Sequence, residues 1–292
     1  MIETWKKSEL DRVMRAHGFR YSKAWGQNFL VDKNVLDKVV SAAELTPDDH
    51  VVEIGPGAGA LTVLLARAAG HVTAVEIDKR LIPLLEDVTE GLANITIIHE
   101  DILKYMKTSG HCEEPNPVLS FPSCKLVGNL PYYITTPIIA GLFEPGADGA
   151  RPVPPELAVF MVQKEVAERL MSPPGKKAYG AISVLVQYYS EIELLHMVSR
   201  DVFTPRPTVD SAVIRLRPRD LSGDDPETAA RMFRLVRAGF DMRRKTLRNS
   251  LAASGFPKDA LAAALERAGI DPVRRAETLS PRDFYTIASR LP

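Results

Sequence analysis

The first two thirds of the chain alternate short apolar runs with segments of helical periodicity. The apolar runs predict strands at HVVEIG (50–55), HVTAVEID (71–78), ITIIHED (95–101), KLVGN (125–129) and LAVFMV (157–162). Helices are predicted at ALTVLLARAA (60–69), RLIPLLEDV (80–88) and QKEVAERLM (163–171). Strands separated by helices of this length predict an α/β fold, in which a parallel sheet is covered by helices on both faces.

Beyond about residue 200 the pattern changes to one strand followed by helices. SAVIRLRP (211–218) predicts the strand, and helices are predicted at ETAARMFRLVRAGF (227–240), RRKTLRNSLAAS (243–254), KDALAAALERAG (258–269) and SPRDFYTIASRL (280–291). We therefore expect a sheet domain over residues 1–218, which includes an N-terminal helical extension over 1–24, and a small all-helical domain over 219–292.

Charge adds an asymmetry to this division. The 292 residues contain 37 Lys and Arg and 37 Asp and Glu, so the formal net charge is zero. Residues 201–292 nevertheless hold 17 basic and 12 acidic side chains, a surplus of five. Such a surplus indicates a polyanionic partner, although it is about equally common on solvated helices.

The cysteines and the apolar segments exclude several classes of protein. Cys112 and Cys124 share one Pro-rich stretch with no histidine at a ligand spacing, which argues against a structural disulfide or a metal site. No run approaches 18 apolar residues, and the first 30 residues contain no apolar leader segment. We expect a cytoplasmic protein that binds no metal and no membrane. A monomer is expected as well, because no exposed apolar heptad is visible.

A glycine loop follows the first predicted strand of the sheet and enters a helix. Gly55-Pro56-Gly57-Ala58-Gly59 lacks Cβ atoms at three positions, which lets the backbone approach a ligand closely. The dinucleotide fingerprint requires a glycine where this chain has Ala60. The spacing favours a nucleotide-like cofactor without a pyrophosphate, and a turn used only for tight packing is the alternative.

Polar residues fall at the ends of four successive predicted strands. Gly55, Glu76, Asp101 and Asn129 each lie at or beside a carboxyl end, the edge where open α/β sheets bind ligands. A carboxylate at Glu76 can accept from both hydroxyls of a ribose, and Asp101 can meet a purine amino group. Any one of these residues could be an ordinary helix cap or loop carboxylate, but four together indicate one ligand crevice.

These residues carry a family resemblance. The chain resembles the S-adenosylmethionine-dependent methyltransferases of class I and, among them, the ribosomal RNA adenine dimethyltransferase family of the bacterial small-subunit (KsgA or RsmA) type. The matching motifs span most of the chain: WGQNFLVD (25–32), VVEIGPGAGALT (51–62), EIDKRL (76–81), EDIL (100–103), NLPYYITTPI (129–138), QKEVAERL (163–170), YGAISVLVQ (179–187), VFTPRPTVDSAVIRL (202–216) and RRKTLRNSL (243–251). The resemblance implies a Rossmann-like, mostly parallel sheet with an antiparallel strand near its end.

The same resemblance implies roles for individual residues. S-adenosylmethionine would be the cofactor, with Gln27, Asn28 and Leu30 closing over its methionine part. The loop of Gly55 and Gly57 would pass beside the cofactor. The ribose would be held by Glu76 and the adenine by Asp101, while Asn129 would border both the cofactor and the substrate. The substrate would be 16S ribosomal RNA in the small ribosomal subunit, and DNA would not be a partner.

The motif Asn129-Leu130-Pro131-Tyr132 suits methylation of an adenine amino group. The amide oxygen of Asn129 and the backbone carbonyl of Leu130 can each accept one amino hydrogen, which directs the nitrogen lone pair at the methyl group. Tyr132 could stack on a base removed from its helix, and Phe203 could cover the other face of that base. For each ring alone, a packing role is the more common one.

Basic residues in RRKTLRNSL form the predicted RNA contact. Arg244 and Arg248 are four apart and Lys245 and Arg248 three apart, so on a helix they share one face, which Arg243 flanks. A solvated helix surface is the alternative for this motif by itself. With a site for a flipped base in the same chain, we expect these four side chains to contact RNA phosphates.

Two positions depart from the family pattern, and several functions stay open. Trp25 stands where the family often has another apolar residue, and Tyr133 stands where many members have Asn, which bears on substrate fit.

The leading function is dimethylation of two adjacent adenosines in a 3′-terminal hairpin of 16S rRNA during small-subunit biogenesis. The alternatives are a 23S rRNA adenine methyltransferase of the Erm type, a non-catalytic assembly factor and, least favoured by the loop spacing, a dinucleotide oxidoreductase.

Overall fold

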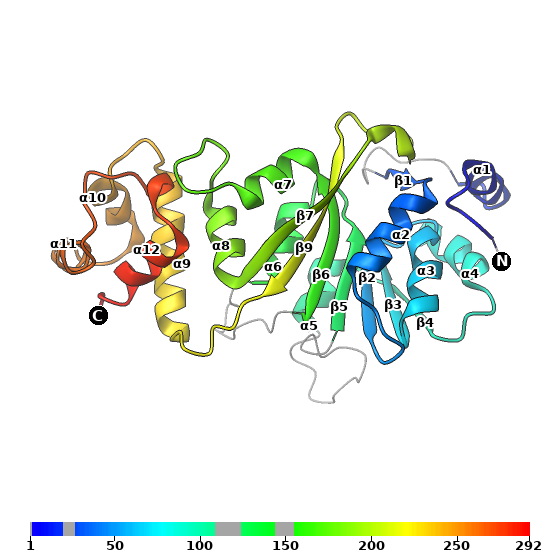
Figure 1. Ribbon diagram of the computed structural model, residues 1–292, viewed down its shortest axis with the longest axis horizontal. Coiled ribbons are helices and arrows are strands. Elements are labelled where there is room, and N and C mark those ends of the chain that lie inside the picture. The colour runs from blue at the N-terminus through cyan, green and yellow to red at the C-terminus, as the bar shows by residue number, and fades with distance from the viewer. Residues whose placement is uncertain (1, 20–26, 109–123, 144–154) are drawn as a thin grey trace. The chain divides into compact units, whose positions relative to one another are not determined.

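The computed structural model describes residues 2–19, 27–108, 124–143 and 155–292 (Figure 1). The chain divides into two compact units. Unit 1 comprises Met1–Leu142, Val153–Ala167 and Glu193–Pro218, and unit 2 comprises Phe143–Pro152, Glu168–Ile192 and Arg219–Pro292. Unit 1 thus ends where the sheet domain was predicted to end, but Glu168–Ile192 groups with the C-terminal helices rather than with the sheet.

One seven-stranded sheet runs in the order β4-β3-β2-β5-β6-β9-β7. Its strands are β2 (His50–Ile54), β3 (His71–Glu76), β4 (Ile95–His99), β5 (Cys124–Asn129), β6 (Leu157–Gln163), β7 (Ser190–Val198) and β9 (Ser211–Pro218). The first five strands in this order pair parallel, and β9 pairs antiparallel with β6. A separate pair, β1 (Phe29–Leu30) and β8 (Phe203–Thr204), is antiparallel. The predicted α/β class and the late antiparallel strand are confirmed.

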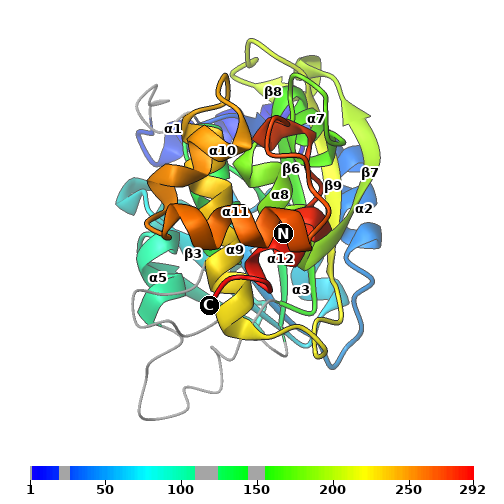
Figure 2. The same ribbon diagram turned by 90° about the vertical axis from the view of Figure 1, so that its left-hand side faces the viewer.

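Helices cover both faces of the sheet in unit 1. Its helical elements are α1 (Lys7–Ala16), α2 (Lys33–Ala42), α3 (Ala60–Ala68), η2 (Lys79–Leu81), α4 (Ile82–Thr89), α5 (Ile102–Thr108), α6 (Thr135–Gly141) and η4 (Arg200–Val202), and α7 (Lys164–Met171) follows β6. α2 and α3 lie on one face of the strands, and α5 and α6 lie on the other (Figures 1 and 2). Because both faces are covered, β2 buries four consecutive residues, from Val51 to Ile54.

Unit 2 is helical and centred on a long amphipathic helix. It contains α8 (Ala181–Tyr189), α9 (Pro226–Asp241), α10 (Leu247–Ser250), η5 (Leu251–Ser254), α11 (Lys258–Arg267), η6 (Ala276–Thr278) and α12 (Pro281–Ala288). The Asp225 side chain caps α9 by accepting from the Thr228 amide at 2.9 Å. Aromatic rings of Tyr188, Phe233 and Tyr285 join α8, α9 and α12. In the part of the chain that the structure describes, no helix is long and apolar enough to span a membrane.

The helix predicted over 243–254 is wrong in its first four residues. α9 ends at Asp241, a turn follows, and α10 begins only at Leu247. Thr246 is extended, with φ −67° and ψ 159°. The amides of Leu247 and Arg248 donate to the carbonyls of Arg274 and Pro272 at 2.7 and 3.1 Å. These long-range hydrogen bonds replace the helical bonds that the local sequence favours.

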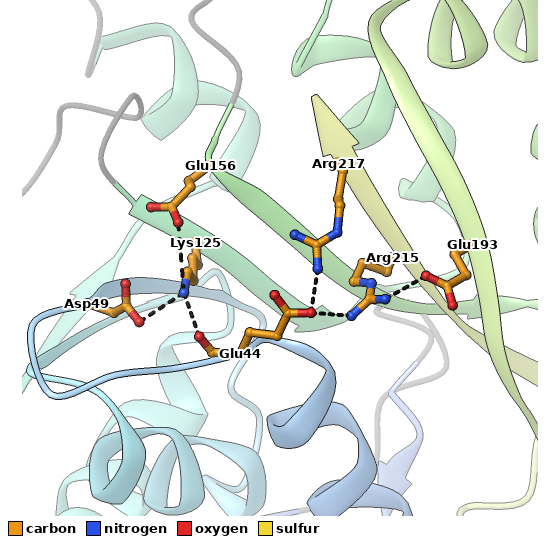
Figure 3. A network of polar contacts seen from close by, with 7 residues as sticks. All are labelled: Glu44, Asp49, Lys125, Glu156, Glu193, Arg215 and Arg217. Carbon is orange, nitrogen blue, oxygen red and sulfur yellow. Dashed lines mark hydrogen bonds and ion pairs between the residues drawn. The ribbon is translucent and has the colours of Figure 1, made fainter. Parts of the chain in front are cut away.

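An ion-pair network ties the segment before β2 to the rest of the sheet (Figure 3). Lys125 of β5 is 8% exposed, and its Nζ lies 2.9 Å from Asp49 Oδ2 and 2.7 Å from the Glu44 carbonyl. The Glu44 carboxylate pairs with Arg217 and, at 2.6 Å, with Arg215 of β9. The network lies at the amino ends of β2 and β5, opposite the edge where their carboxyl ends meet.

The Asp49–Lys125 pair predicts a stability change in acid. Burial alone would raise the pKa of Asp49, but hydrogen bonds from Lys125 and Thr46 lower it below its usual value. A depressed pKa means that the ionised form stabilises the fold above about pH 4, and that this stability is lost as the pH falls through the folded-state pKa. Asp49→Asn should lower the free energy of unfolding by about 2 kcal/mol at pH 7, because it leaves Lys125 buried with a weaker partner.

Urea unfolding at pH 7 and at pH 3 measures this effect. Glu156→Gln is the matched control, because Glu156 is 58% exposed and lies 4.0 Å from Lys125, and it should cost about 0.5 kcal/mol or less. Equal costs for the two variants at pH 7 would contradict the assignment.

Candidate cofactor and substrate site

A cleft lies at the carboxyl ends of the four adjacent strands β4, β3, β2 and β5. All eight residues predicted to bind the cofactor line it: Gln27, Asn28, Leu30, Gly55, Gly57, Glu76, Asp101 and Asn129. Parallel pairing brings them together, because parallel strands present their carboxyl ends at one edge of the sheet. The prediction that four strand ends form one crevice is therefore confirmed with respect to the positions of these residues.

The glycine loop depends on left-handed backbone at all three of its glycines, of which Gly55 has φ 68°. Gly57 has φ 59° and Gly59 has φ 77°, a region that L side chains rarely adopt. A Cβ on Gly59 would lie 2.9 Å from Leu85 Cδ1, so a side chain there would collide with α4. The loop thereby turns tightly from β2 into α3, and its residues Gly55, Pro56, Gly57 and Ala58 line the cleft.

Glu76 ends β3 as a buried carboxylate whose orientation is fixed. Its Oε1 accepts from the Asp78 amide at 2.8 Å, and its Oε2 accepts from the Gly57 amide at 3.1 Å. Burial raises the pKa of Glu76, and these backbone donors oppose that rise. Because a carboxylate has about four acceptor positions, Glu76 retains the capacity to accept from two hydroxyl groups of a ligand.

Asp101 and Gln27 line the cleft, and each side chain already makes a hydrogen bond within the protein. Asp101 caps α5, because its Oδ1 accepts from the Leu103 amide at 2.8 Å. Gln27 donates from Nε2 to Asp78 Oδ2 at 2.7 Å, and Asp78 also accepts from Arg80. Gln27 is thus held by a carboxylate that the sequence had not singled out.

Asn129 meets the segment that contains Asn28. Its Nδ2 donates to the backbone carbonyl of Asn28 at 3.0 Å, so the nitrogen end of the amide is oriented by that contact. The Leu130 amide donates to the Met161 carbonyl of β6 at 3.0 Å. Pro131 fixes the next backbone angle, and its carbonyl accepts from the Thr135 hydroxyl at 3.0 Å. The backbone on both sides of Leu130 is therefore rigid.

Two tyrosines follow this motif at the rim of the cleft. The Tyr132 hydroxyl lies 2.8 Å from Ser211 Oγ at the start of β9, which fixes the orientation of the ring. Tyr133 is 49% exposed, which is unusual for a large aromatic side chain. Both residues line the cleft, so flat rings border the same space as Asn129.

Phe203 does not join this group. It is 3% exposed, belongs to the hydrophobic core of unit 1 and pairs with Leu30 between β8 and β1. It is not among the residues that line the cleft. Core packing accounts for the position of this side chain, so we do not propose Phe203 as a second stacking ring.

The four basic residues predicted to contact RNA are not equivalent. Arg243 donates to the carbonyls of Lys177 and Tyr179 and pairs with Glu277 at 3.1 Å, all within unit 2. Arg244, Lys245 and Arg248 are exposed, and no ion pair links them to another described residue. Because Arg243–Lys245 lie in a turn, the shared helix face predicted for the motif is not formed.

Sequence reasoning missed three polar groups of the cleft, one of which is Glu100 at the end of β4. Glu53 of β2 lines it with 1% exposure, and Thr4 of the N-terminal segment lines it with 1% exposure. The signal for Glu53 was a carboxylate within an apolar, doubly covered strand. No local signal could have placed Thr4 in a cleft that is also lined by a loop more than 50 residues later in the chain. Trp25 and Cys112 lie outside the described residues.

Comparison with known proteins agrees with this geometry. Residues 18–292 match the family described as ribosomal RNA adenine dimethylase. The chain is 46% identical over 292 residues to ribosomal RNA small subunit methyltransferase A of Pelotomaculum thermopropionicum, covering 99% of this chain and 97% of that protein. It is 44% identical over 288 residues to the protein of the same name from Bacillus mycoides, covering 96% and 94%.

Two solved structures share the fold over most of the chain. A dimethyladenosine transferase from Plasmodium falciparum superposes with a TM-score of 0.72 at 28% identity, covering 89% of this chain and 95% of that one. The 23S rRNA methyltransferase ErmE superposes with a TM-score of 0.66 at 30% identity, covering 90% and 99%. With a class I methyltransferase fold, a cleft at the predicted edge and a family match over 18–292, this chain belongs to the ribosomal RNA adenine dimethylase family.

Proposed function

We propose that this protein transfers methyl groups from S-adenosylmethionine to the amino groups of two adjacent adenosines near the 3′ end of 16S rRNA, giving two dimethyladenosines. The observation that carries the proposal is the Asn129 amide, held against the cofactor cleft beside two aromatic rings. Full-length similarity to small-subunit methyltransferases supports the choice of ribosomal RNA. Since the substrate is a ribosomal subunit in assembly, we place its action in the cytoplasm.

The donor atoms of the cleft fit the proposed cofactor. Glu76 has acceptor capacity left for the two ribose hydroxyls, and Asp101 has further acceptor positions for a purine amino group. Gly55 and Gly57 have no Cβ, so their backbone borders the cleft directly. Gln27, Asn28 and Leu30, which belong to the N-terminal part of the chain, line the same cleft. When bound, the cofactor would supply an electrophilic methyl group.

Asn129 and Leu130 would prepare the nucleophile. The amino lone pair of adenine is delocalised into the ring, so the site must localise it. With its nitrogen end turned to the Asn28 carbonyl, Asn129 can present its oxygen to one amino hydrogen. The Leu130 carbonyl, on rigid backbone, can accept the other hydrogen. No general base is required at Asn129, because the attacked nitrogen becomes acidic and releases its proton to water.

Tyr132 would hold the target base after it leaves its helix. Base–aromatic stacking is worth about 1–3 kcal/mol, and a ring fixed by its hydroxyl loses little freedom on stacking. The bond from Tyr132 to Ser211 gives it that fixed orientation. Tyr133 adds an exposed ring that lines the same cleft.

An Erm-type activity on 23S rRNA is the second candidate, supported by the similarity to ErmE at 30% identity. Identity of 44–46% to small-subunit methyltransferases over nearly the whole chain favours the first. The two are separated by supplying labelled S-adenosylmethionine with unmodified small subunits or with large subunits. Methylation of the small subunit alone is expected, and methylation of the large subunit alone would overturn the proposal.

The role of Asn129 predicts a loss of turnover without a loss of substrate binding. Asn129→Ala should lower the methylation rate of small subunits by roughly 10²-fold or more, the effect of losing a preorganised hydrogen-bonding group. Single-turnover assays measure the rate, and filter binding measures the affinity for RNA. This affinity should stay within about twofold of that of the wild-type protein. Near-normal turnover in a folded variant would remove Asn129 from the chemistry.

The role of Glu76 predicts weaker cofactor binding. Glu76→Ala should reduce the affinity for S-adenosylmethionine by about 1.5–3 kcal/mol, the value of hydrogen bonds to a charged group. Titration calorimetry gives this difference. Glu86→Ala is the control, because Glu86 is exposed on α4, outside the cleft, and it should leave the affinity unchanged. An equal effect of both substitutions would show that Glu76 does not hold the ribose.

The exposed basic residues predict a salt-dependent contact with RNA. Replacing Arg244 and Arg248 with Ala should weaken binding to the small subunit and flatten the slope of log affinity against log salt by about 0.7–0.9 per lost phosphate contact. Arg243→Ala should instead lower the stability of unit 2, because that side chain bonds within it. An unchanged salt slope in the double variant would redirect the search to Lys6, Lys7, Arg12, Arg15 and Lys23.

A further inference from the structure

The segment before residue 18 is fixed to unit 1, although the family match begins only at that residue. Its buried apolar residues belong to the hydrophobic core of unit 1: Trp5, Leu10, Val13 and Met14. His17 follows α1, and its Nε2 lies 2.9 Å from Oδ2 of Asp87 on α4, the helix that lies near α1 (Figure 1). This segment is therefore a packed part of the sheet unit.

A tight turn before α1 holds Thr4 in place. The Lys6 amide donates to the Glu3 carbonyl at 2.8 Å, and the side chains of these two residues form an ion pair. Thr4 and Trp5 are the central residues of the turn, and they are 1% and 5% exposed. Trp5 packs in the core, whereas Thr4 lines the cleft. The buried indole thus anchors the turn that carries Thr4 to the cleft.

The Thr4 hydroxyl is the unusual feature of this turn. Its Oγ1 is buried and has no hydrogen-bond partner among the residues that the structure describes. Thr89 and Thr135 are also buried, but their hydroxyls donate to backbone carbonyls at 2.8 and 3.0 Å. A buried hydroxyl without a partner destabilises the fold, because it loses water and gains no replacement. At Thr4 the missing partner can come from a ligand in the cleft.

We propose that Thr4 is a further ligand-binding residue, whose hydroxyl forms a hydrogen bond with the cofactor when the cofactor occupies the cleft. A hydroxyl can donate or accept, so it suits a polar group of the nucleoside part or of the amino-acid part. The turn and Trp5 hold Thr4 before the ligand arrives, so little conformational freedom is lost on binding. This inference rests on the proposed use of S-adenosylmethionine.

Thr4→Val separates ligand binding from stability, because valine has nearly the same shape and no hydroxyl. The affinity for S-adenosylmethionine should fall by about three- to tenfold, the effect of one hydrogen bond. The ligand-free variant should melt at the same temperature as the wild-type protein or higher, because a methyl group replaces an unpaired hydroxyl. Titration calorimetry and thermal unfolding measure the two quantities. A lower melting temperature with unchanged affinity would show a structural role and overturn the proposal.

Two further variants test whether the hydroxyl itself is responsible. Thr4→Ser keeps the hydroxyl and should bind S-adenosylmethionine within about twofold of the wild-type protein. Thr89→Val is the matched control, because Thr89 is a buried threonine of α4 outside the cleft, and it should leave the affinity unchanged. If Thr4→Ser weakened binding as much as Thr4→Val, packing of the methyl group would explain the effect and the hydroxyl would have no role.

Two other ligands locate the hydrogen bond. S-adenosylhomocysteine contains the nucleoside and amino-acid parts, whereas adenosine contains the nucleoside alone. If Thr4→Val weakens binding of S-adenosylhomocysteine only, the bond is to the amino-acid part, and if it weakens binding of both, the bond is to the nucleoside. Unchanged affinity for both would contradict the proposal. Failure of the wild-type protein to bind S-adenosylmethionine would instead overturn the proposed cofactor, and this inference with it.

Discussion

The parallel pairing of β2 with β3 and β5 is the constraint on which the site depends. Paired in register, these strands end at one edge, which sets the glycine loop, Glu76 and Asn129 around a common space. The hydrogen bond from the Gly57 amide to Glu76 then joins the loop to the next strand. Since a shift of one residue would turn every side chain to the other face, the register and the site are determined together.

At the amino ends of the same strands, ion pairs rather than a glycine loop connect the neighbouring segments. Lys125 and Arg215 gather Glu44, Asp49 and Glu193 around the starts of β2 and β5 and the second half of the antiparallel strand β9 (Figure 3). This network keeps the base of the sheet rigid while the opposite edge keeps backbone and carboxyl groups available. Stability and ligand binding are thus assigned to opposite ends of the same strands.

The electrostatics of the two units differ in the way that the proposed substrates require. The cleft of unit 1 is lined by carboxyl groups, which suit the proposed cationic cofactor, whereas unit 2 leaves Arg244, Lys245 and Arg248 exposed to solvent. Zero net charge for the whole chain conceals this division. A small cation and a phosphate backbone each interact with the charges of the nearby surface rather than with the net charge of the whole protein.

The sequence by itself determined every strand of the seven-stranded sheet except β7, the helices with strong periodicity, and the residues at the strand ends, because these depend on local pattern and on the fixed polarity of parallel sheets. Only the tertiary structure decided the rest. It broke the helix predicted over 243–254 through hydrogen bonds to the segment 272–274, drew Phe203 into the core, and engaged Arg243 within unit 2. It also set the burial of Glu53, whose Oε2 has no hydrogen-bond partner among the residues that the structure describes. Long-range contacts compete with local preference at these positions, and a linear sequence does not record which contact prevails.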